Sequence, residues 1–509
     1  MRPLNILIIL LAAMPLFSLG QQPEKGRVRG ELLVKFMPGT RAEAARAVNQ
    51  ENGAVILERF SDTGWIRVKL PKGKDLDSAM TDYMESGNVL AVQPNFYYHL
   101  SVTPNDANFG SLWGMTKISA PQAWDLSTGG PAVVVANIDT GVKYTHEDLA
   151  ANMWTNPGEI SNNGVDDDGN GFVDDYYGYD FFFNDPDPLD EHGHGTHTAG
   201  TIGAVGNNTI GVVGVNWNVK LMAIKIYDSD GLGTTSAMLI NAYNYVRMMK
   251  ERGVNIRVTN NSYGGCDEAC GYDQATKDAI DALGRTGVLQ VFAAGNDGRN
   301  IDTQPAYPAA YNSPWIISVA NSTSTDARAL SSNFGPVNVD LAAPGTGILS
   351  TISSPANYST LTGTSMAAPH VAGAAALLAA HAPSLSAASL KATILNNVDQ
   401  IAEWNGVVKT GGRLNVLHAL QNQTVCSFNV PGGPITVPTK GGYFSVEVAA
   451  GQNCDYQITS NDRWIKVSGV DSLSGNGTAT FRATLNPTIT RVGTIQIAGT
   501  AITVTQSRN

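Results

Sequence analysis

Three polar residues far apart in the chain could together cleave an acyl bond. Ser365 follows a Gly-Thr turn and enters an apolar stretch, residues 366–378, which predicts a helix buried on every side. The positive end of that helix dipole would favour negative charge developing at the hydroxyl. Most serines in front of helices only cap them, and a nucleophile also needs a base and an orienting acid. Both are available, because Asp139 ends the apolar run 133–138 and His194 begins a stretch of small residues.

The elements around these residues predict an α/β sheet. The run 133–139 indicates a central parallel strand with Asp139 at its carboxyl end, where open α/β sheets hold their sites. Asp, His and Ser follow one another in the subtilisin order. With the segments 138–141 (IDTG), 194–197 (HGTH) and 363–369 (GTSMAAP), the chain resembles the subtilisin-like serine proteases from about residue 113 to about residue 420. The resemblance implies a doubly wound, mainly parallel α/β catalytic domain.

In a catalytic triad, His194 takes the proton of Ser365, and Asp139 fixes the tautomer of the imidazole. The alternative is a zinc-like cluster, since His192, His194 and His197 have the spacing H-x-H-x-x-H. That alternative leaves Asp139 and Ser365 without a role, so we favour the triad.

A further polar group, Asn296, follows the predicted strand 288–294. Acyl transfer needs a donor for the oxyanion, and the resemblance gives this role to the Asn296 amide beside the Ser365 N–H. Without that role Asn296 would be an ordinary turn residue. The resemblance also implies a P1 pocket between two segments, Ser262, Tyr263 and Gly264 on one side and Ala293, Ala294 and Gly295 on the other.

An acidic stretch, residues 164–175 (GVDDDGNGFVDD), has the spacing of a calcium loop. The expected ligands are side-chain or carbonyl oxygens of Asp166, Asp168, Asn170, Phe172 and Asp175, with Asp174 as the alternative to Asp175. The stretch departs from an EF-hand, which would have a glutamate at position 177 in place of tyrosine. The alternative is a solvated acidic turn, but so many carboxylates repel one another unless a cation binds.

The resemblance implies a second structural calcium site. Its ligands would be Asp148, Asn208, Ile210 and Val212, with Asp106 as a further candidate. The loop around residue 206 is one residue longer than the family pattern, and the alternative is an asparagine-rich turn.

Composition sets the class of protein. The 509 residues are 43% hydrophobic and 15% charged, which fits several globular domains. A net charge of −11 argues against nucleic acid or an anionic membrane as a partner and suits a protein that holds cations. Residues 1–20 predict a cleavable signal peptide, with Arg2 before an apolar run too short to span a membrane. We therefore expect a secreted, extracellular protein.

Four cysteines in an exported chain predict disulfides, although free buried thiols are the alternative. Three pairings are open, and the spacing favours Cys266–Cys270 and Cys426–Cys454.

Residues 21–102 predict a small α/β unit before the peptidase domain. Strands are expected at 31–36, 65–70 and 89–94, and helices at 41–49 and 76–85. The resemblance implies an inhibitory propeptide that covers the active site, assists folding and is cut off between about residues 97 and 105. The alternative is a permanent accessory domain. Residues 103–420 would then be the peptidase domain.

The composition changes after residue 420, and residues 424–509 predict a small β-sandwich of short strands. The spacing of Cys454, Trp464, the turn 475–477 and the strand 491–497 resembles a BACON domain, which implies a carbohydrate or glycoprotein partner. Trp464 is expected in the core beside Ile465.

Together these patterns predict a monomeric, secreted, calcium-stabilised serine endopeptidase that acts on proteins or peptides and processes its own proenzyme. The alternative from another class is an extracellular glycan- or protein-binding protein with a latent protease scaffold. A narrowly specific processing protease would differ only in substrate.

Overall fold

The computed structural model describes residues 27–97, 102–264, 271–486 and 489–507. The chain forms two compact units, residues 1–100 and 101–509. No helix of the described ranges is long and apolar enough to cross a membrane.

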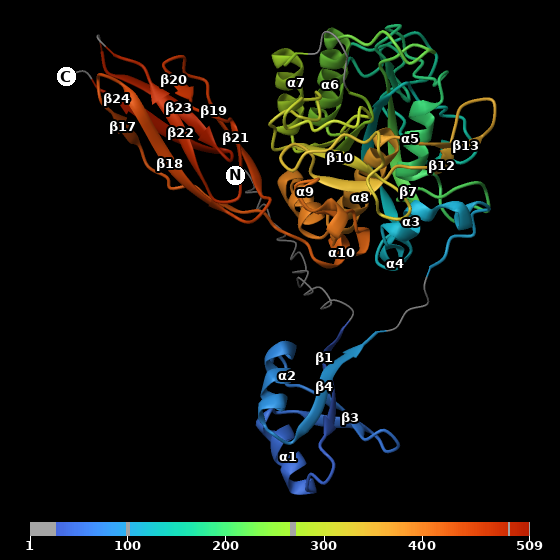
Figure 1. Ribbon diagram of the computed structural model, residues 1–509, viewed down its shortest axis with the longest axis vertical. Coiled ribbons are helices and arrows are strands. Elements are labelled where there is room, and N and C mark those ends of the chain that lie inside the picture. The colour runs from blue at the N-terminus through green and yellow to red at the C-terminus, as the bar shows by residue number, and fades with distance from the viewer. Residues whose placement is uncertain (1–26, 98–101, 265–270, 487–488, 508–509) are drawn as a thin grey trace, which may run out of the picture. The chain divides into compact units, whose positions relative to one another are not determined.

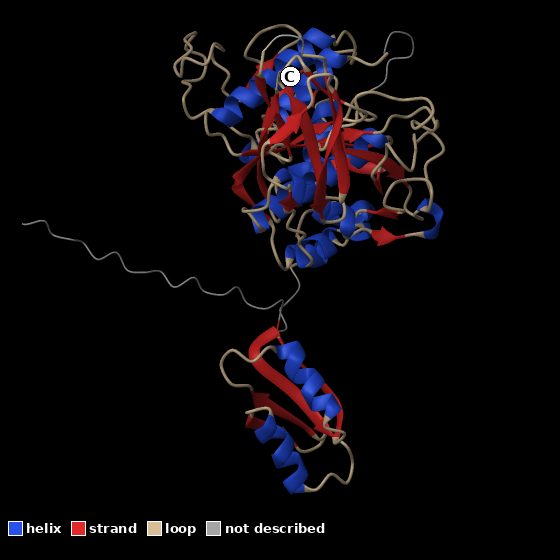
Figure 2. Ribbon diagram, turned by 90° about the vertical axis from the view of Figure 1, so that its left-hand side faces the viewer, coloured by secondary structure: helices blue, strands red, loops and turns tan. Residues whose placement is uncertain are grey.

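The first unit is an antiparallel sheet with two helices on one face (Figure 2). The strand order is β2-β3-β1-β4. Alternate residues of β1, Leu32 and Val34, are fully buried under the helices, as the period-two pattern predicts. The bounds are β1 Arg27–Phe36, β2 Val55–Phe60, β3 Trp65–Lys69 and β4 Val89–Phe96, with α1 Ala42–Glu51 and α2 Leu76–Glu85. The sequence did not predict β2, whose side chains are nearly all exposed.

The second unit contains a nine-stranded sheet in the order β14-β15-β11-β10-β9-β8-β5-β7-β6. Every pair is parallel except β14 with β15, so the sheet is mainly parallel as predicted. The strands are β5 Gly129–Asp139, β6 Gly178–Asp180, β7 Asn218–Lys225, β8 Ile256–Asn261, β9 Leu289–Ala293, β10 Ile316–Ser322, β11 Leu341–Pro344, β14 Asp399–Gln400 and β15 Gly412–Arg413, and a separate hairpin joins β12 Ile348–Thr351 to β13 Tyr358–Leu361.

Helices cover both faces of this sheet (Figure 1). The central strand β5 shows why, because Val133 and Val135 pack with α5 and α8 while Val134 and Ile138 pack with α6 and α7. A strand buried on both faces is a continuous apolar run. The helices are α3 Trp113–Lys117, α4 Ala120–Trp124, α5 His194–Gly203, α6 Ser236–Glu251, α7 Gln274–Gly284, α8 Thr364–His381, α9 Ala387–Asn396 and α10 Val416–Gln421, with 3-10 turns Phe109–Ser111, Ala150–Asn152 and Ala402–Trp404.

The C-terminal part is all β. One sheet has the order β16-β18-β22-β20 and the other β17-β24-β23-β19-β21, around one apolar core. The strands are β16 Phe428–Asn429, β17 Ile435–Val437, β18 Gly442–Ala450, β19 Asp455–Ser460, β20 Ile465–Val467, β21 Ser472–Ser474, β22 Gly477–Ala483, β23 Arg491–Ile497 and β24 Thr500–Gln506. A disulfide joins Cys426 to Cys454.

The expectation for Trp464 needs correction. Ile465 is buried, but Trp464 lies half-buried at the edge of the core, and the Arg491 guanidinium stands 4.4 Å above its ring. A cation placed over an indole ring is attracted by the negative face of the ring, so Arg491 at the start of β23, a strand of the second sheet, covers this tryptophan with its charged side chain.

Candidate active site

The carboxyl end of β5 meets the first residue of α5. Asp139 is 2% exposed, and its Oδ1 lies 2.6 Å from His194 Nδ1. The Asp139 carboxylate also accepts hydrogen bonds from the Thr140 N–H and the Thr198 hydroxyl. Because a carboxylate only accepts, His194 carries its proton on Nδ1, and Nε2 remains available as a base.

The pKa of His194 is raised above its ordinary value. Burial opposes the charged ring, but the charge and the hydrogen bond of Asp139 outweigh it. The site therefore favours the imidazolium that forms when His194 accepts a proton.

Ser365 is the second residue of α8, a helix buried along nearly its whole length as the apolar sequence predicts. The half-buried hydroxyl donates to the carbonyl of Ser262 at 3.1 Å, and the Ser262 hydroxyl donates back to the carbonyl of Ser365 at 2.9 Å. Such resting contacts can be replaced when a substrate binds, since catalytic hydrogen bonds often form only in the complex.

Asn296 lies beside the backbone that leads into Ser365. A Cβ built on Gly363 would lie 3.4 Å from Asn296 Nδ2 and 3.7 Å from Ser365 N. The other end of the Asn296 amide is occupied, because its Oδ1 accepts from both the N–H and the hydroxyl of Thr364. Two hydrogen bonds from Thr364 therefore fix the orientation of the Asn296 amide.

Asp139, His194, Asn296 and Ser365 all line one cleft of about 630 Å³. Of the predicted P1-pocket residues, this cleft includes Ser262, Tyr263, Gly264, Ala293 and Gly295. Ala294 is 1% exposed and lies behind the wall rather than in it.

The cleft also has residues that the sequence did not single out. Ala306, Tyr307 and Pro308 form part of its lining, and so do Tyr227 and the loop 230–234. The Tyr263 side chain points inward, with its hydroxyl hydrogen-bonded to the hydroxyl of Tyr243. These residues have no chemical signature in the sequence.

The three histidines do not gather around a common point. His197 is fully buried, and its Nε2 lies 2.9 Å from the carbonyl oxygen of Ile348. Burial lowers the pKa of His197 to about 4, so it is neutral at physiological pH. The rings of His192 and His194 are 6.3 Å apart. The structure thus gives no support to the zinc-like cluster.

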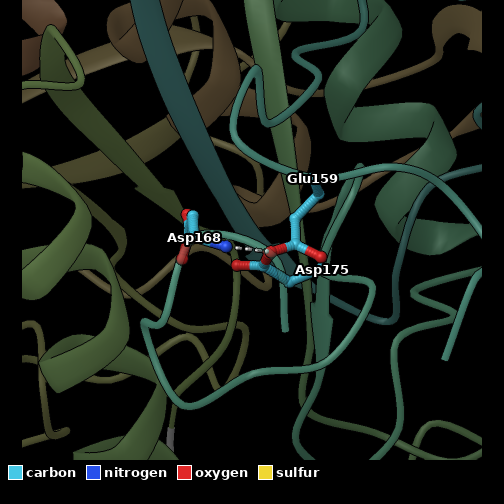
Figure 3. A group of neighbouring side chains, drawn as sticks. All are labelled: Glu159, Asp168 and Asp175. Carbon is cyan, nitrogen blue, oxygen red and sulfur yellow. Dashed lines mark hydrogen bonds between the residues drawn. The ribbon is translucent and has the colours of Figure 1, made fainter. Parts of the chain in front are cut away.

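Three carboxylates from the predicted calcium region do converge. Oxygens of Glu159, Asp168 and Asp175 lie within 4.8 Å of one another (Figure 3). Burial raises the pKa of Asp175 to about 6, although its carboxylate accepts hydrogen bonds from Asn156, Asn170 and Tyr245. Hard oxygens grouped in this way fit Ca²⁺.

The membership of this group differs from the sequence prediction. Glu159 was not predicted, and Asp166 lies outside the group because its two oxygens accept the N–H groups of Asn170 and Gly171. The Asn170 amide donates to Asp175, while the Phe172 ring packs among aromatic residues.

The second predicted site contains two buried carboxylates. Asp148 is fully buried, and burial raises its pKa to about 6; its oxygens accept from Asn208 and from the Val212 N–H. Asp106 is 5% exposed, and its Oδ1 has no hydrogen-bond partner among the described residues. The charge of Asp106 also raises the pKa of Asp148, and a buried oxygen without a partner near a second buried carboxylate fits a cation. The Ile210 N–H donates to the Asn208 side chain.

Cys266 and Cys270 lie outside the described residues.

An α/β domain with an Asp–His pair, a serine at a helix N-terminus and two converging N–H donors in one cleft has the groups of a serine hydrolase. Residues 130–427 match the family described as "Subtilase family", and residues 19–95 match "Fervidolysin N-terminal prodomain". The chain therefore belongs to the subtilase family, and it is a serine protease with an N-terminal prodomain.

Named relatives agree with this assignment. The chain is 38% identical over 320 residues to thermitase of Thermoactinomyces vulgaris, covering 63% of this chain and 99% of thermitase. It is 32% identical over 399 residues to a thermophilic serine proteinase of Bacillus sp. strain AK1, covering 78% of this chain and 89% of that protein. An extracellular protease of Xanthomonas campestris pv. campestris is 34% identical over 343 residues, covering 64% of this chain and 57% of that protein.

A solved structure described as proteases from Pseudoalteromonas arctica PAMC 21717 has a TM-score of 0.50 at 30% identity. The superposition covers 63% of this chain and 99% of the solved chain. The similarity extends the family assignment to the three-dimensional fold.

Proposed function

We propose that this protein is a secreted, calcium-stabilised endopeptidase that cleaves peptide bonds through an acyl-enzyme on Ser365. The proposal rests first on the 2.6 Å contact between Asp139 Oδ1 and His194 Nδ1 in the cleft that holds Ser365. In the first step Ser365 Oγ attacks the scissile carbonyl carbon while His194 Nε2 takes the hydroxyl proton. His194 then gives that proton to the leaving amine, and the C–N bond breaks. Water, deprotonated in turn by His194, attacks the ester carbonyl carbon, and His194 returns that proton to Ser365 Oγ as the acid product is released.

The tetrahedral oxyanion would accept hydrogen bonds from Asn296 Nδ2 and from the Ser365 N–H. Thr364 holds Asn296 through two contacts, so the donor needs little reorganisation during the reaction. Asp139 keeps the imidazole in the required tautomer and stabilises it once protonated.

The chain would be made as a proenzyme. The prodomain family match supports a propeptide in residues 21–102, after a signal peptide in residues 1–20. The peptidase domain would occupy residues 103–420 and the sandwich residues 424–509. Export is supported by the Xanthomonas relative, which is named an extracellular protease.

Calcium would be held at two places in the catalytic domain. Glu159, Asp168 and Asp175 would form one site, and Asp106 and Asp148 would take part in the other. A bound Ca²⁺ would neutralise buried carboxylates and tie their loops together, without a role in bond cleavage.

The test is a casein digest by residues 21–509 expressed with calcium, beside a Ser365→Ala control. We expect loss of casein together with shortening of the chain near residue 100, both absent from the control. A chain that stays full length is clipped near residue 100 with a trace of another protease. Casein cleavage after clipping would support the endopeptidase activity and contradict only the self-processing. A clipped chain that does not cleave casein would favour the latent binding scaffold.

A further inference from the structure

The wall of the cleft formed by residues 306–308 continues directly into a segment that touches the C-terminal sandwich. Tyr307 lines the cleft, and its ring stacks on Tyr311 with centroids 4.7 Å apart. The Tyr311 N–H donates to the carbonyl of Pro308 at 3.0 Å, which closes a tight turn. The cleft wall is therefore stacked on, and bonded to, the next turn of the chain.

That turn is held from behind by a buried charged network. The Ser313 hydroxyl donates to Asp281 Oδ1 at 2.8 Å. The other oxygen of Asp281 accepts from Lys277 Nζ at 2.8 Å and from the Gln457 side chain at 3.1 Å. Lys277 and Asp281 lie on α7, whereas Gln457 lies on β19 of the sandwich.

The sandwich supplies the remaining partners. Asp471, just before β21, lies 3.0 Å from Lys277 Nζ, and the Asn312 amide donates to the carbonyl of Ser472 at 3.5 Å. Lys277 is only 2% exposed although it carries a charge. A buried ammonium needs paired carboxylates, and one of the two carboxylates that pair with Lys277 belongs to the sandwich.

A second set of contacts holds the sandwich against α9 of the catalytic domain. On α9, Lys391 forms a buried ion pair with Asp455 of β19, 2.7 Å apart. At the end of α9, the Asn396 side chain accepts from Asn453 at 2.7 Å. Cys426, one end of the sandwich disulfide, donates its N–H to the Ser389 hydroxyl. Buried pairs of this kind fix relative geometry because only one arrangement satisfies both charges.

We infer that the C-terminal β-sandwich positions the cleft wall 306–308 through Asp471, Gln457 and the Lys277–Asp281–Ser313 network, and so belongs to the substrate-binding apparatus of the mature enzyme. Asp471 and Gln457 are positioning residues that do not touch the substrate. The inference rests on the proposed function only in taking this cleft as the place where the peptide binds.

The experiment compares the double variant Gln457→Ala/Asp471→Asn with Glu447→Gln. The control makes the same acid-to-amide change at an exposed position of β18, where Glu447 accepts a hydrogen bond from the Thr478 hydroxyl. The first readout is hydrogen exchange by mass spectrometry in the Ser365→Ala background, which needs no activity. We expect faster exchange in peptides covering residues 306–313 of the double variant, with β5 unchanged, and wild-type exchange in the control.

The second readout is steady-state kinetics on a peptide substrate. Loss of two part-buried hydrogen-bond partners should raise KM roughly three- to tenfold while kcat stays within about twofold. Asp471→Glu, which keeps a carboxylate for Lys277, should restore most of the wild-type KM.

Exchange in residues 306–313 that equals the control would overturn the inference, whatever the kinetics. If the double variant does not fold, the single Asp471→Asn variant is judged by the same exchange criterion. An inactive wild type would contradict the proposed function but leave the exchange comparison intact.

Discussion

Acid should destabilise this protein through His370, a buried histidine on α8, the helix that also carries Ser365. His370 is 1% exposed, its Nδ1 lies 2.9 Å from the carbonyl oxygen of Met366, and its Nε2 faces Gly114. Burial lowers its pKa from 6.5 to about 4. The unfolded chain therefore binds this proton first, and stability that is fully present above pH 6.5 is lost as the pH falls toward 4.

The size of the effect follows from the two pKa values. Between pH 7 and pH 5 the protonation of the unfolded state costs roughly 2 kcal/mol for this histidine. For a folded unit of this length, a loss of that free energy of unfolding lowers the thermal midpoint by about 2–3 °C. His197, whose pKa is also lowered to about 4 by burial, should add a similar amount.

The assay isolates His370 by comparing Ser365→Ala with Ser365→Ala/His370→Gln by calorimetry at one scan rate. The Ser365→Ala background prevents self-digestion, and carboxylates common to both proteins cancel in the difference. We expect the variant to be less stable at pH 7 and the gap to shrink by about 2–3 °C at pH 5. A gap that stays constant from pH 7 to pH 5 would refute the reasoning.

Two further predictions concern the oxyanion donor and calcium. Asn296→Ala should lower kcat by roughly 10²-fold with little change in KM. Thr364→Val, which removes one of the two contacts that orient Asn296, should lower kcat by roughly tenfold. Wild-type turnover in steady-state kinetics would count against the donor role. Removing calcium with a chelator should lower the thermal midpoint, and Glu159→Gln should reduce the size of that drop. A thermal midpoint that is the same with and without the chelator would argue against both calcium sites.

The elements that carry the proposed catalytic groups were predictable because each lies in a motif whose local structure is nearly determined by sequence. The run before Asp139 could only be a buried strand, and the stretch after Ser365 only a buried helix. Asn296 was found by resemblance, but the role of Thr364 in orienting it was not predicted, since that contact depends on how α8 meets the loop after β9.

The parts that sequence did not predict depend on tertiary contacts. Glu159 precedes the acidic stretch and joins Asp168 only because the loop folds back. Asp166 has the spacing of a ligand, yet it caps its own turn, because nearby N–H groups compete for the same oxygens. The cleft wall 306–308 is mostly apolar and therefore carries no signature of binding.

The central claim is that Ser365 is an activated nucleophile, and the most direct measurement is fluorophosphonate labelling of the mature chain followed by peptide mapping. The account predicts one modified peptide, the one that contains Ser365, with labelling lost in Asp139→Asn because an amide can donate to His194 Nδ1 and so favours the tautomer whose Nε2 carries the proton. Labelling of a different serine, or a mature chain that takes up no label, would contradict it.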